Sequence, residues 1–310
     1  MNKPISSRRR QLLAAGAALS VSGPLWATSP APDPPLTRKV PSSGVALPVV
    51  GIGTNRFRLG DDAWMKRLRG TLIEFIGGGG TVIDTAPSYG DSEQAIGTLL
   101  AGAPGLRQPA FLATKVDRDA ADEGREQLEK SFAALHTERL DLVQLHNLHG
   151  VDKVLPVLRE QKAAGRIGHI GITTSEERQY AEMEAILRRE SFDFIQINYA
   201  VGNRKAEERL LPLAADRGMA VLVNLPLGRG AQFRAVGERP LPPWAMDMGC
   251  YSWAQVFLKF VVSHPAVTCA IPGSTQAAHV ADNLGAARGR FLEAAERQTI
   301  ARYFDTIADG

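Results

Sequence analysis

The chain has 310 residues, of which 44% are hydrophobic and 22% charged, and this composition is typical of a folded globular protein. A chain of this length could hold two domains, although α/β barrels of this size are commonly single domains. The net charge is +3, and Lys3 with the arginines at positions 8–10 supplies four positive charges in a leader without acids. The remainder has no basic excess, so we expect no nucleic-acid partner.

The first 27 residues have the pattern of an export signal. Ser7 and the arginines at 8–10 precede an apolar stretch that starts at Leu12, and Ala27 is a small residue suited to cleavage. The stretch is too short and too weakly hydrophobic for a membrane span, so we predict a signal peptide over 1–27 and no stable membrane insertion after processing. The arginines resemble a twin-arginine signal, which implies contact with the twin-arginine export machinery and a periplasmic or otherwise exported protein. An uncleaved amphipathic anchor and an ordinary secretory signal are the alternatives.

A proline-rich linker is predicted at 28–37, and from residue 38 the sequence alternates between strand-like and helical stretches. A short hairpin comes first, with its turn at Ser43 and Gly44. The strands are predicted at 49–54, 81–86, 110–116, 140–146, 167–173, 192–200, 219–226 and 266–274. Helical stretches separate them, and 290–307 adds a terminal helix.

Eight strands that alternate with helices imply parallel pairing, and eight is the number that closes a barrel. We therefore predict an α/β fold, a single (β/α)8 TIM barrel over residues 38–310 with an N-terminal β-hairpin and an extra C-terminal helix. A doubly wound open sheet is the alternative, and the strand count disfavours it.

The chain has two cysteines, Cys250 and Cys269. An oxidising compartment would permit a disulfide between them. However, Cys269 lies in AVTCAIP, which is typical of a buried strand where a small apolar thiol is common. We therefore predict no disulfide.

Four of the predicted strands carry polar side chains at their C-terminal ends, where the catalytic groups of such barrels lie. Residues two apart on a strand share a face. The polar residues that this alternation aligns are Asp84, Lys115, Gln144 with His146, and Gln196 with Asn198. A single Lys or His in a strand is commonly a core residue whose hydrogen bonds are made within the protein. Four strands that each end in polar side chains instead indicate that these side chains point into one cavity on the barrel axis.

Tyr89 follows Asp84 by five residues in VIDTAPSYGDSEQAIG, where Gly90 allows the chain to turn. A cationic Lys115 beside Tyr89 would favour the tyrosinate, and Asp84 would hold Lys115 charged and oriented. With His146 as a hydrogen-bond donor to a carbonyl, this set is suited to protonating an oxyanion as it forms. The alternative is a Schiff-base lysine, as in barrel aldolases. Asp84 argues against it, because a close carboxylate keeps the amine of Lys115 protonated.

Six motifs resemble those of the aldo/keto reductases over nearly all of residues 38–310. They are GGTVIDTAPSYGDSE, LATKV, LDLVQLHNL, GRIGHIGITTS, FIQINYA and AIPGSTQAAHVADN. The resemblance implies that Asp84, Tyr89, Lys115 and His146 form a catalytic tetrad, with Tyr89 as general acid. It also implies an NADP(H)-dependent oxidoreductase that reduces aldehydes or ketones to alcohols without a metal. No G-x-G-x-x-G stands between a strand and a helix, so the barrel itself must bind the dinucleotide.

The resemblance extends to a cofactor site. Gln196 matches the glutamine that holds the nicotinamide carboxamide, and Thr174 stands where an asparagine commonly shares that task. The other matching positions are Gly53 and Thr54 near the nicotinamide ribose, Leu227, Gly228 and Gly230 at the pyrophosphate, and Ser274, His279 and Asn283 at the adenosine end.

Three further positions depart from the family pattern. Asn224 stands where many members have a tyrosine that stacks on the nicotinamide. Gly273 and His279 stand where many have a Lys and an Arg that hold the 2′-phosphate. A neutral His is a poorer phosphate ligand than an Arg. NADP(H) is therefore the expected cofactor, with NAD(H) as the alternative.

An uncharged small-molecule carbonyl compound is the expected substrate, because the candidate pocket positions are aromatic with few charges. The second candidate function is a non-catalytic nicotinamide-nucleotide-binding redox sensor or regulatory protein, as in the channel β-subunits that share this fold. A complete tetrad favours catalysis. Since the twin-arginine route carries folded proteins, export implies that NADP(H) is loaded before transport.

Overall fold

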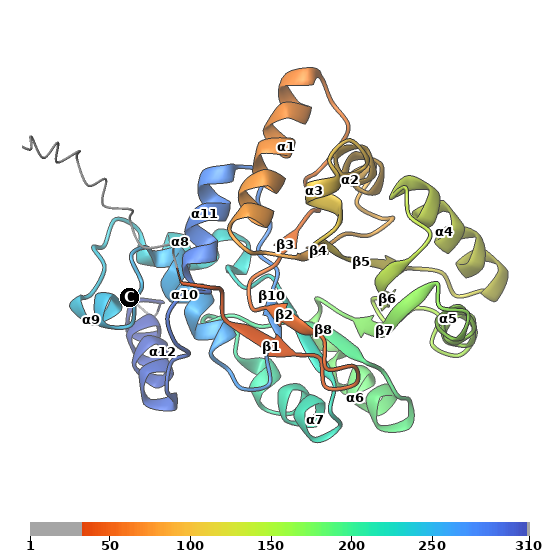
Figure 1. Cartoon of the computed structure of the whole chain (residues 1–310). Coiled ribbons are helices and arrows are strands. Elements are labelled where there is room, and N and C mark those ends of the chain that lie inside the picture. Colours follow the sequence, from red (N-terminus) through yellow and green to blue (C-terminus); the bar gives the residue numbers. More distant parts are fainter. Residues whose placement is uncertain (1–32, 309–310) are drawn as a thin grey trace, which may run out of the picture. The chain divides into compact units, whose positions relative to one another are not determined.

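The structure is a computed structural model that describes residues 33–308, and eight parallel strands form a barrel at its centre (Figure 1). They are Ile52–Gly53 (β3), Val82–Asp84 (β4), Phe111–Val116 (β5), Leu140–His146 (β6), Ile167–Thr173 (β7), Phe194–Asn198 (β8), Ala220–Asn224 (β9) and Cys269–Ala270 (β10). Each strand pairs with the next along the chain, and the bridges Val50–Ala270 and Gly53–Gly273 connect the first strand region to the last. The predicted TIM barrel is confirmed.

Helices follow the strands and cover the outside of the barrel (Figure 1). The larger ones are Asp62–Gly77 (α1), Ser92–Ala101 (α2), Ala121–Ala134 (α4), Val154–Ala163 (α5), Tyr180–Arg189 (α6), Leu210–Asp216 (α7), Trp253–Val262 (α10), Ala277–Gly285 (α11) and Ala294–Ala308 (α12). Short ones are Pro104–Arg107 (α3), Ala231–Val236 (α8), Pro243–Asp247 (α9), and the 3₁₀ turns Glu177–Gln179 (η1), Lys205–Glu207 (η2) and Gly228–Gly230 (η3).

Local sequence explains where α1 and α10 begin. The side chain of Asp61 accepts a hydrogen bond from the Trp64 amide at 2.8 Å, and Ser252 caps α10 in the same way through the amide of Gln255 at 3.1 Å. Such caps satisfy amides that have no partner inside the helix. Helix α10 is buried almost all round, which explains why its sequence is apolar without a polar stripe.

The hairpin of Thr37–Lys39 (β1) and Ala46–Pro48 (β2) closes the N-terminal end of the barrel, and it crosses the barrel in Figure 1. Gly44 in its turn has a φ of +75°, which glycine adopts without strain. Val40 and Leu47 pack with the side chains inside the barrel. Strand β1 begins at Thr37, the last residue of the predicted linker. The predicted signal peptide and the linker residues 28–32 lie outside the described residues.

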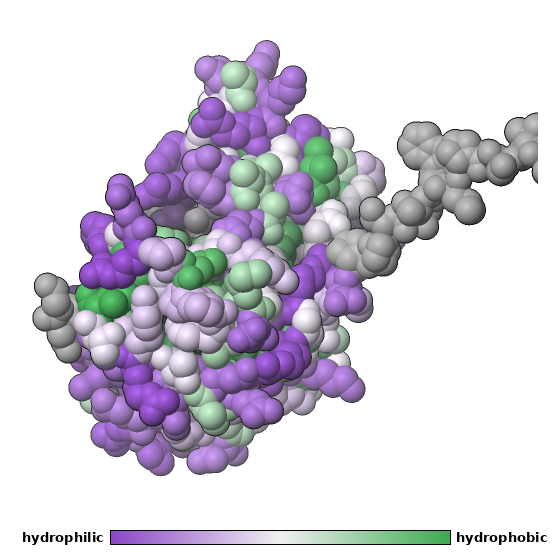
Figure 2. Space-filling model, turned by 90° about the vertical axis from the view of Figure 1, so that its left-hand side faces the viewer, coloured by the Kyte–Doolittle hydropathy of each residue, from purple (hydrophilic) through white to green (hydrophobic). Residues whose placement is uncertain are grey.

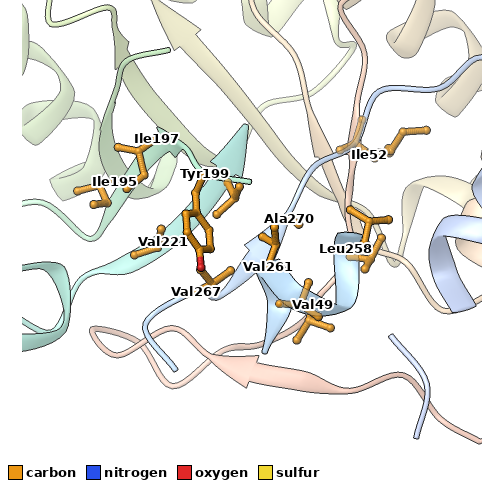
Figure 3. Close-up of a cluster of buried hydrophobic side chains, with 14 of the residues drawn as sticks. Val49, Ile52, Ile195, Ile197, Tyr199, Val221, Leu258, Val261, Val267 and Ala270 are labelled. Carbon is orange, nitrogen blue, oxygen red and sulfur yellow. The ribbon is translucent and has the colours of Figure 1, made fainter. Parts of the chain in front are cut away.

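The core has two layers because successive residues of a strand point to opposite faces. Phe194 and Leu222 point into the barrel, where they pack with Phe111. Outside the barrel, Figure 3 shows Ile195 and Ile197 of β8 in one cluster with side chains of α10. The inward-facing apolar layer fills the base of the barrel. The polar residues that face inward come two positions further along the strands and lie at the C-terminal mouth of the barrel.

The surface of the described residues is largely polar, and Figure 2 shows one mostly hydrophilic face with apolar side chains toward its middle. Exposed large hydrophobic residues are few: Val45, Leu59, Ile73, Phe233, Met246 and Tyr251. Cys250 and Cys269 are both buried free thiols, which confirms the prediction of no disulfide. None of the helices in residues 33–308 is long and apolar enough to cross a membrane.

Candidate active site

A buried ion pair lies at the mouth of the barrel. Lys115 on β5 and Asp84 at the end of β4 are 1% and 2% exposed, and Nζ donates to the two carboxylate oxygens at 2.9 and 2.8 Å. Nζ also donates to the carbonyl oxygen of Thr85 at 2.8 Å. Burial opposes the ammonium charge, but Asp84 and Tyr89 together outweigh it, so the pKa of Lys115 lies above its usual value. Burial raises the pKa of the Asp84 carboxyl, and Lys115 opposes that rise. The contacts are those of an ammonium with a carboxylate.

Tyr89 lies beside this pair, in the turn between β4 and α2. Its amide donates to the carbonyl of Ala86 at 3.0 Å, and Gly90 follows with a φ of +67°. The Lys115 Nζ lies 5.1 Å from the centroid of the Tyr89 ring, and the His146 ring is 6.2 Å away in an edge-to-face arrangement. Tyr89 is only partly buried. Tyr89 therefore keeps part of its surface exposed, whereas Lys115 and Asp84 are buried.

His146 ends β6 next to Tyr89, and its Nδ1 lies 3.3 Å from the hydroxyl of Ser88. Burial, with the charge of Lys115 as a second cause, lowers the pKa of His146 to about 4. The ring is therefore neutral at neutral pH and has one N–H donor. When the Ser88 hydroxyl donates to Nδ1, that proton is on Nε2, which is then free to bind a carbonyl oxygen.

The lowered pKa of His146 predicts a loss of stability in acid. The unfolded chain takes up a proton at this residue near pH 6.5, whereas the folded protein does so only near pH 4. The contribution of His146 to the free energy of unfolding is complete above pH 6.5 and falls by about 3 kcal/mol as the pH drops toward 4. Urea unfolding of wild type and His146→Gln at pH 7 and 4.5 measures this. The variant should gain stability relative to wild type at the lower pH, and a constant difference would contradict the shift.

Two buried amides connect the ion pair to the predicted cofactor site. The Nε2 of Gln144 donates to Oε1 of Gln196 at 2.6 Å and lies 3.5 Å from one oxygen of Asp84. The Nε2 of Gln196 lies 3.5 Å from the other oxygen. Gln144 was not among the predicted site residues, although strand alternation put it on the same face as His146. The carboxylate is thus surrounded by donors, which favours its ionised form.

Thr54 and Gly53, predicted near the nicotinamide ribose, lie beside the end of β4, where Gly53 of β3 pairs with Asp84. The amide and the hydroxyl of Thr54 both donate to the carbonyl of Asp84, at 3.1 and 2.9 Å, and the Ser92 hydroxyl donates to the carbonyl of Thr54 at 2.9 Å. Gly53 forms a bridge with Gly273. The contacts of Thr54 therefore fix the position of Asp84, a role that the sequence does not reveal.

Thr174, predicted to share the binding of a carboxamide, is fully buried after β7. Its hydroxyl donates to Oε1 of Gln179 at 2.5 Å and accepts from the Glu176 amide at 3.0 Å. Asn224, at the end of β9, donates through Nδ2 to the carbonyl of Thr174 at 3.2 Å. The hydroxyl of Thr174 is thus hydrogen-bonded within the loop that follows β7.

The positions predicted at the pyrophosphate form the tight turn after β9. Gly228 and Gly230 have φ values of +54° and +83°, which explains the glycines. Their amides donate to the carbonyls of Leu225 and Leu227, each at 2.9 Å. These two amides are therefore bonded within the turn in this structure.

The positions predicted at the adenosine end follow β10. The hydroxyl of Ser274 accepts from the Gln276 amide at 3.1 Å just before α11. Asn283 is buried within α11, and His279 is exposed on the same helix. These residues follow the C-terminal end of β10, the same end of the strands that carries Asp84, Lys115 and His146.

Comparisons with known proteins agree with this geometry. The model of the aldo/keto reductase family matches residues 49–301. The chain is 30% identical over 253 residues to the methylglyoxal reductase YeaE of Escherichia coli (strain K12), a match that covers 78% of this chain and 86% of that protein. The solved holo form of the aldo-keto reductase AKR11C1 from Bacillus halodurans is 25% identical with a TM-score of 0.71, covering 86% of this chain and 96% of that one. An aldo/keto reductase from Klebsiella pneumoniae, solved in complex with NADP and acetate, is 25% identical with a TM-score of 0.72, covering 84% and 93%.

Proposed function

Since the chain belongs to the aldo/keto reductase family and is a nicotinamide-dependent carbonyl oxidoreductase, we propose that it reduces aldehydes or ketones with NADP(H) and that Tyr89 is the proton donor. One observation carries the proposal. The half-buried Tyr89 ring has its centroid 5.1 Å from Nζ of the fully buried Lys115–Asp84 pair and 6.2 Å from the centroid of the His146 ring. Such a phenol can give up its proton next to a fixed positive charge.

The residues at the barrel mouth fit a nicotinamide nucleotide. A carboxamide has two N–H donors and one acceptor oxygen, and the amide of Gln196 and the buried Oδ1 of Asn224 are matching partners. Among the described residues, this Oδ1 has no hydrogen-bond partner. When bound, the nicotinamide supplies the two electrons that reduce the carbonyl carbon. The residues proposed to hold the nucleotide are Gly53, Thr54, Thr174, Gln196, Leu227, Gly228, Gly230, Ser274, His279 and Asn283.

Each member of the tetrad has one role in the reduction. Neutral His146 donates its N–H to the carbonyl oxygen and orients it. Tyr89 transfers its proton to that oxygen as negative charge develops there. Lys115 stabilises the tyrosinate that remains, and Asp84 keeps Lys115 charged and in place. All three N–H donors of Lys115 are bonded, to the two oxygens of Asp84 and to Thr85. This arrangement disfavours the alternative of a Schiff-base lysine, which needs a free amine.

A turnover assay tests the proposed function. The purified protein is mixed with NADPH or NADH and with members of a carbonyl panel, including an aromatic aldehyde and methylglyoxal, and the nicotinamide absorbance is followed. We expect carbonyl-dependent oxidation of the nucleotide and formation of the alcohol. The exposed His279 and the absence of a side chain at Gly273 predict only a modest preference for NADPH over NADH. Nucleotide binding without turnover across the panel would favour the redox sensor instead.

We also propose that residues 1–27 direct the folded protein through the twin-arginine machinery, with NADP(H) already bound. A bound nucleotide stabilises the folded state that this route transports. Fractionation of cells that produce the full chain, followed by analysis of the nucleotide in the exported protein, tests this. Periplasmic protein without nucleotide would contradict loading before export.

A further inference from the structure

Asn224 faces the barrel axis at the mouth, and one end of its amide is unused. It pairs in register with Asn198 of β8, and it shares a strand face with Leu222, which packs inside the barrel. Its Nδ2 donates to the carbonyl of Thr174 at 3.2 Å. If the side-chain amide were turned round, Oδ1 would face the carbonyl oxygen of Thr174, and the two oxygens would repel each other. Oδ1 is therefore the end of the amide that does not contact Thr174. This atom is buried and has no partner in residues 33–308.

A buried acceptor without a partner destabilises the folded state, and native proteins contain few of them. The neighbouring groups that could serve as acceptors are already bonded. The hydroxyl of Thr174 is engaged by Gln179 and by the amide of Glu176. The Oε1 of Gln196 accepts from Gln144 at 2.6 Å. Two side-chain oxygens of the barrel strands near this edge of the mouth are buried without a partner in residues 33–308, Oδ1 of Asn224 and Oε1 of Gln144. The Oε1 of Gln144 lies against Gly171 of β7, whereas Asn224 ends β9 at the mouth.

We infer that Asn224 binds the carboxamide of the nicotinamide by accepting a hydrogen bond from its NH₂ group through Oδ1. The inference rests on the proposed function, because it assumes that a nicotinamide nucleotide occupies the mouth. Thr174 then acts on the nucleotide through Asn224: its backbone carbonyl fixes the amide of Asn224, and its hydroxyl is hydrogen-bonded within its own loop. Asn224 would thus hold the carboxamide at a position where the sequence provides no aromatic ring to stack on the nicotinamide.

A nucleotide analogue separates this role from a structural one. The 3-acetylpyridine analogue of NADP⁺ carries a methyl group in place of the carboxamide NH₂ and keeps the carbonyl. Dissociation constants of NADP⁺ and of the analogue are measured by calorimetry for wild type and Asn224→Leu. Wild type should bind NADP⁺ about tenfold more tightly than the analogue, as expected for one hydrogen bond. Asn224→Leu should bind NADP⁺ about tenfold more weakly than wild type does, and it should bind the analogue as tightly as wild type does.

Three controls accompany the measurement. 2′-Phospho-ADP-ribose, which lacks the nicotinamide, should bind both proteins equally and so report an intact fold. Asn203→Leu removes an asparagine whose amide is satisfied at both ends, by Glu177 and by the Lys205 amide, and should leave the discrimination unchanged. Asn224→Asp keeps an acceptor but sets its second oxygen against the carbonyl of Thr174, so it should weaken the binding of both nucleotides and keep part of the discrimination between them.

Two results would overturn the inference, and they are distinguishable. Equal loss of affinity for NADP⁺ and the analogue in Asn224→Leu would show that Asn224 acts only by supporting Thr174. Failure of folded wild type to bind either nucleotide would overturn the cofactor assignment, and the inference with it.

Discussion

Tyr89→Phe should lower kcat for carbonyl reduction by about 10²–10⁴-fold and leave the Kd for NADPH unchanged. The substitution removes one hydroxyl and keeps the ring that lies 6.2 Å from His146 and 5.1 Å from the Nζ of Lys115. The proton donor is lost, whereas the packing of the turn is retained. Steady-state kinetics with NADPH and an aromatic aldehyde, together with nucleotide titration, measures both quantities.

The control for Tyr89→Phe is Tyr251→Phe, which removes the same atom from a side chain that is 70% exposed on the surface. Tyr251→Phe should have wild-type kcat and Kd. Turnover by Tyr89→Phe at the wild-type rate would show that another group supplies the proton. A loss of nucleotide affinity equal to the loss of turnover would instead place Tyr89 in binding.

The largest expected effect on stability follows from breaking the buried ion pair. Lys115→Met leaves the Asp84 carboxylate 2% exposed and without its cation, which should lower the free energy of unfolding by about 3–5 kcal/mol. Turnover should also be lost, because no charge remains beside Tyr89 to stabilise the tyrosinate. Urea unfolding and the NADPH oxidation assay measure the two effects.

The double variant Asp84→Asn with Lys115→Met separates stability from chemistry. It removes both charges, so no uncompensated ion remains buried, and much of the lost stability should return. Activity should not return. If Lys115→Met does not fold, the double variant still provides the comparison with wild type. Equal stability of Lys115→Met and wild type, or an active double variant, would contradict the role assigned to the pair.

The barrel and the convergence of the tetrad were predictable because both depend on short-range periodicity. Eight strand–helix repeats determine the fold, and strand alternation puts Lys115 and His146 on inward faces at the barrel mouth. Tyr89 could be placed near them because it follows Asp84 through a turn of only five residues. These relations require no knowledge of side-chain conformation.

The hydrogen-bond partners at the site were not predictable, because they depend on register between strands and on side-chain conformation. Gln144 contacts Gln196 across 52 positions of the chain, and the hydroxyl of Thr54 contacts the carbonyl of Asp84 across 30. The residue at which the fold begins was not predictable for the same reason. Proline content suggested an unstructured segment to residue 37, but the amide of Leu36 donates to the carbonyl of Ala287 at 2.7 Å and starts the fold earlier.

The most direct measurement is a crystal structure of the protein with NADP⁺ and a carboxylate or ketone inhibitor bound. The central claim is that groups from distant parts of the chain converge to protonate a carbonyl oxygen at the barrel mouth. We expect an inhibitor oxygen within hydrogen-bond distance of both the Tyr89 hydroxyl and the His146 ring, with the nicotinamide beside it. An inhibitor bound elsewhere beside a bound nucleotide, or a Tyr89 hydroxyl turned away from Lys115, would contradict the account.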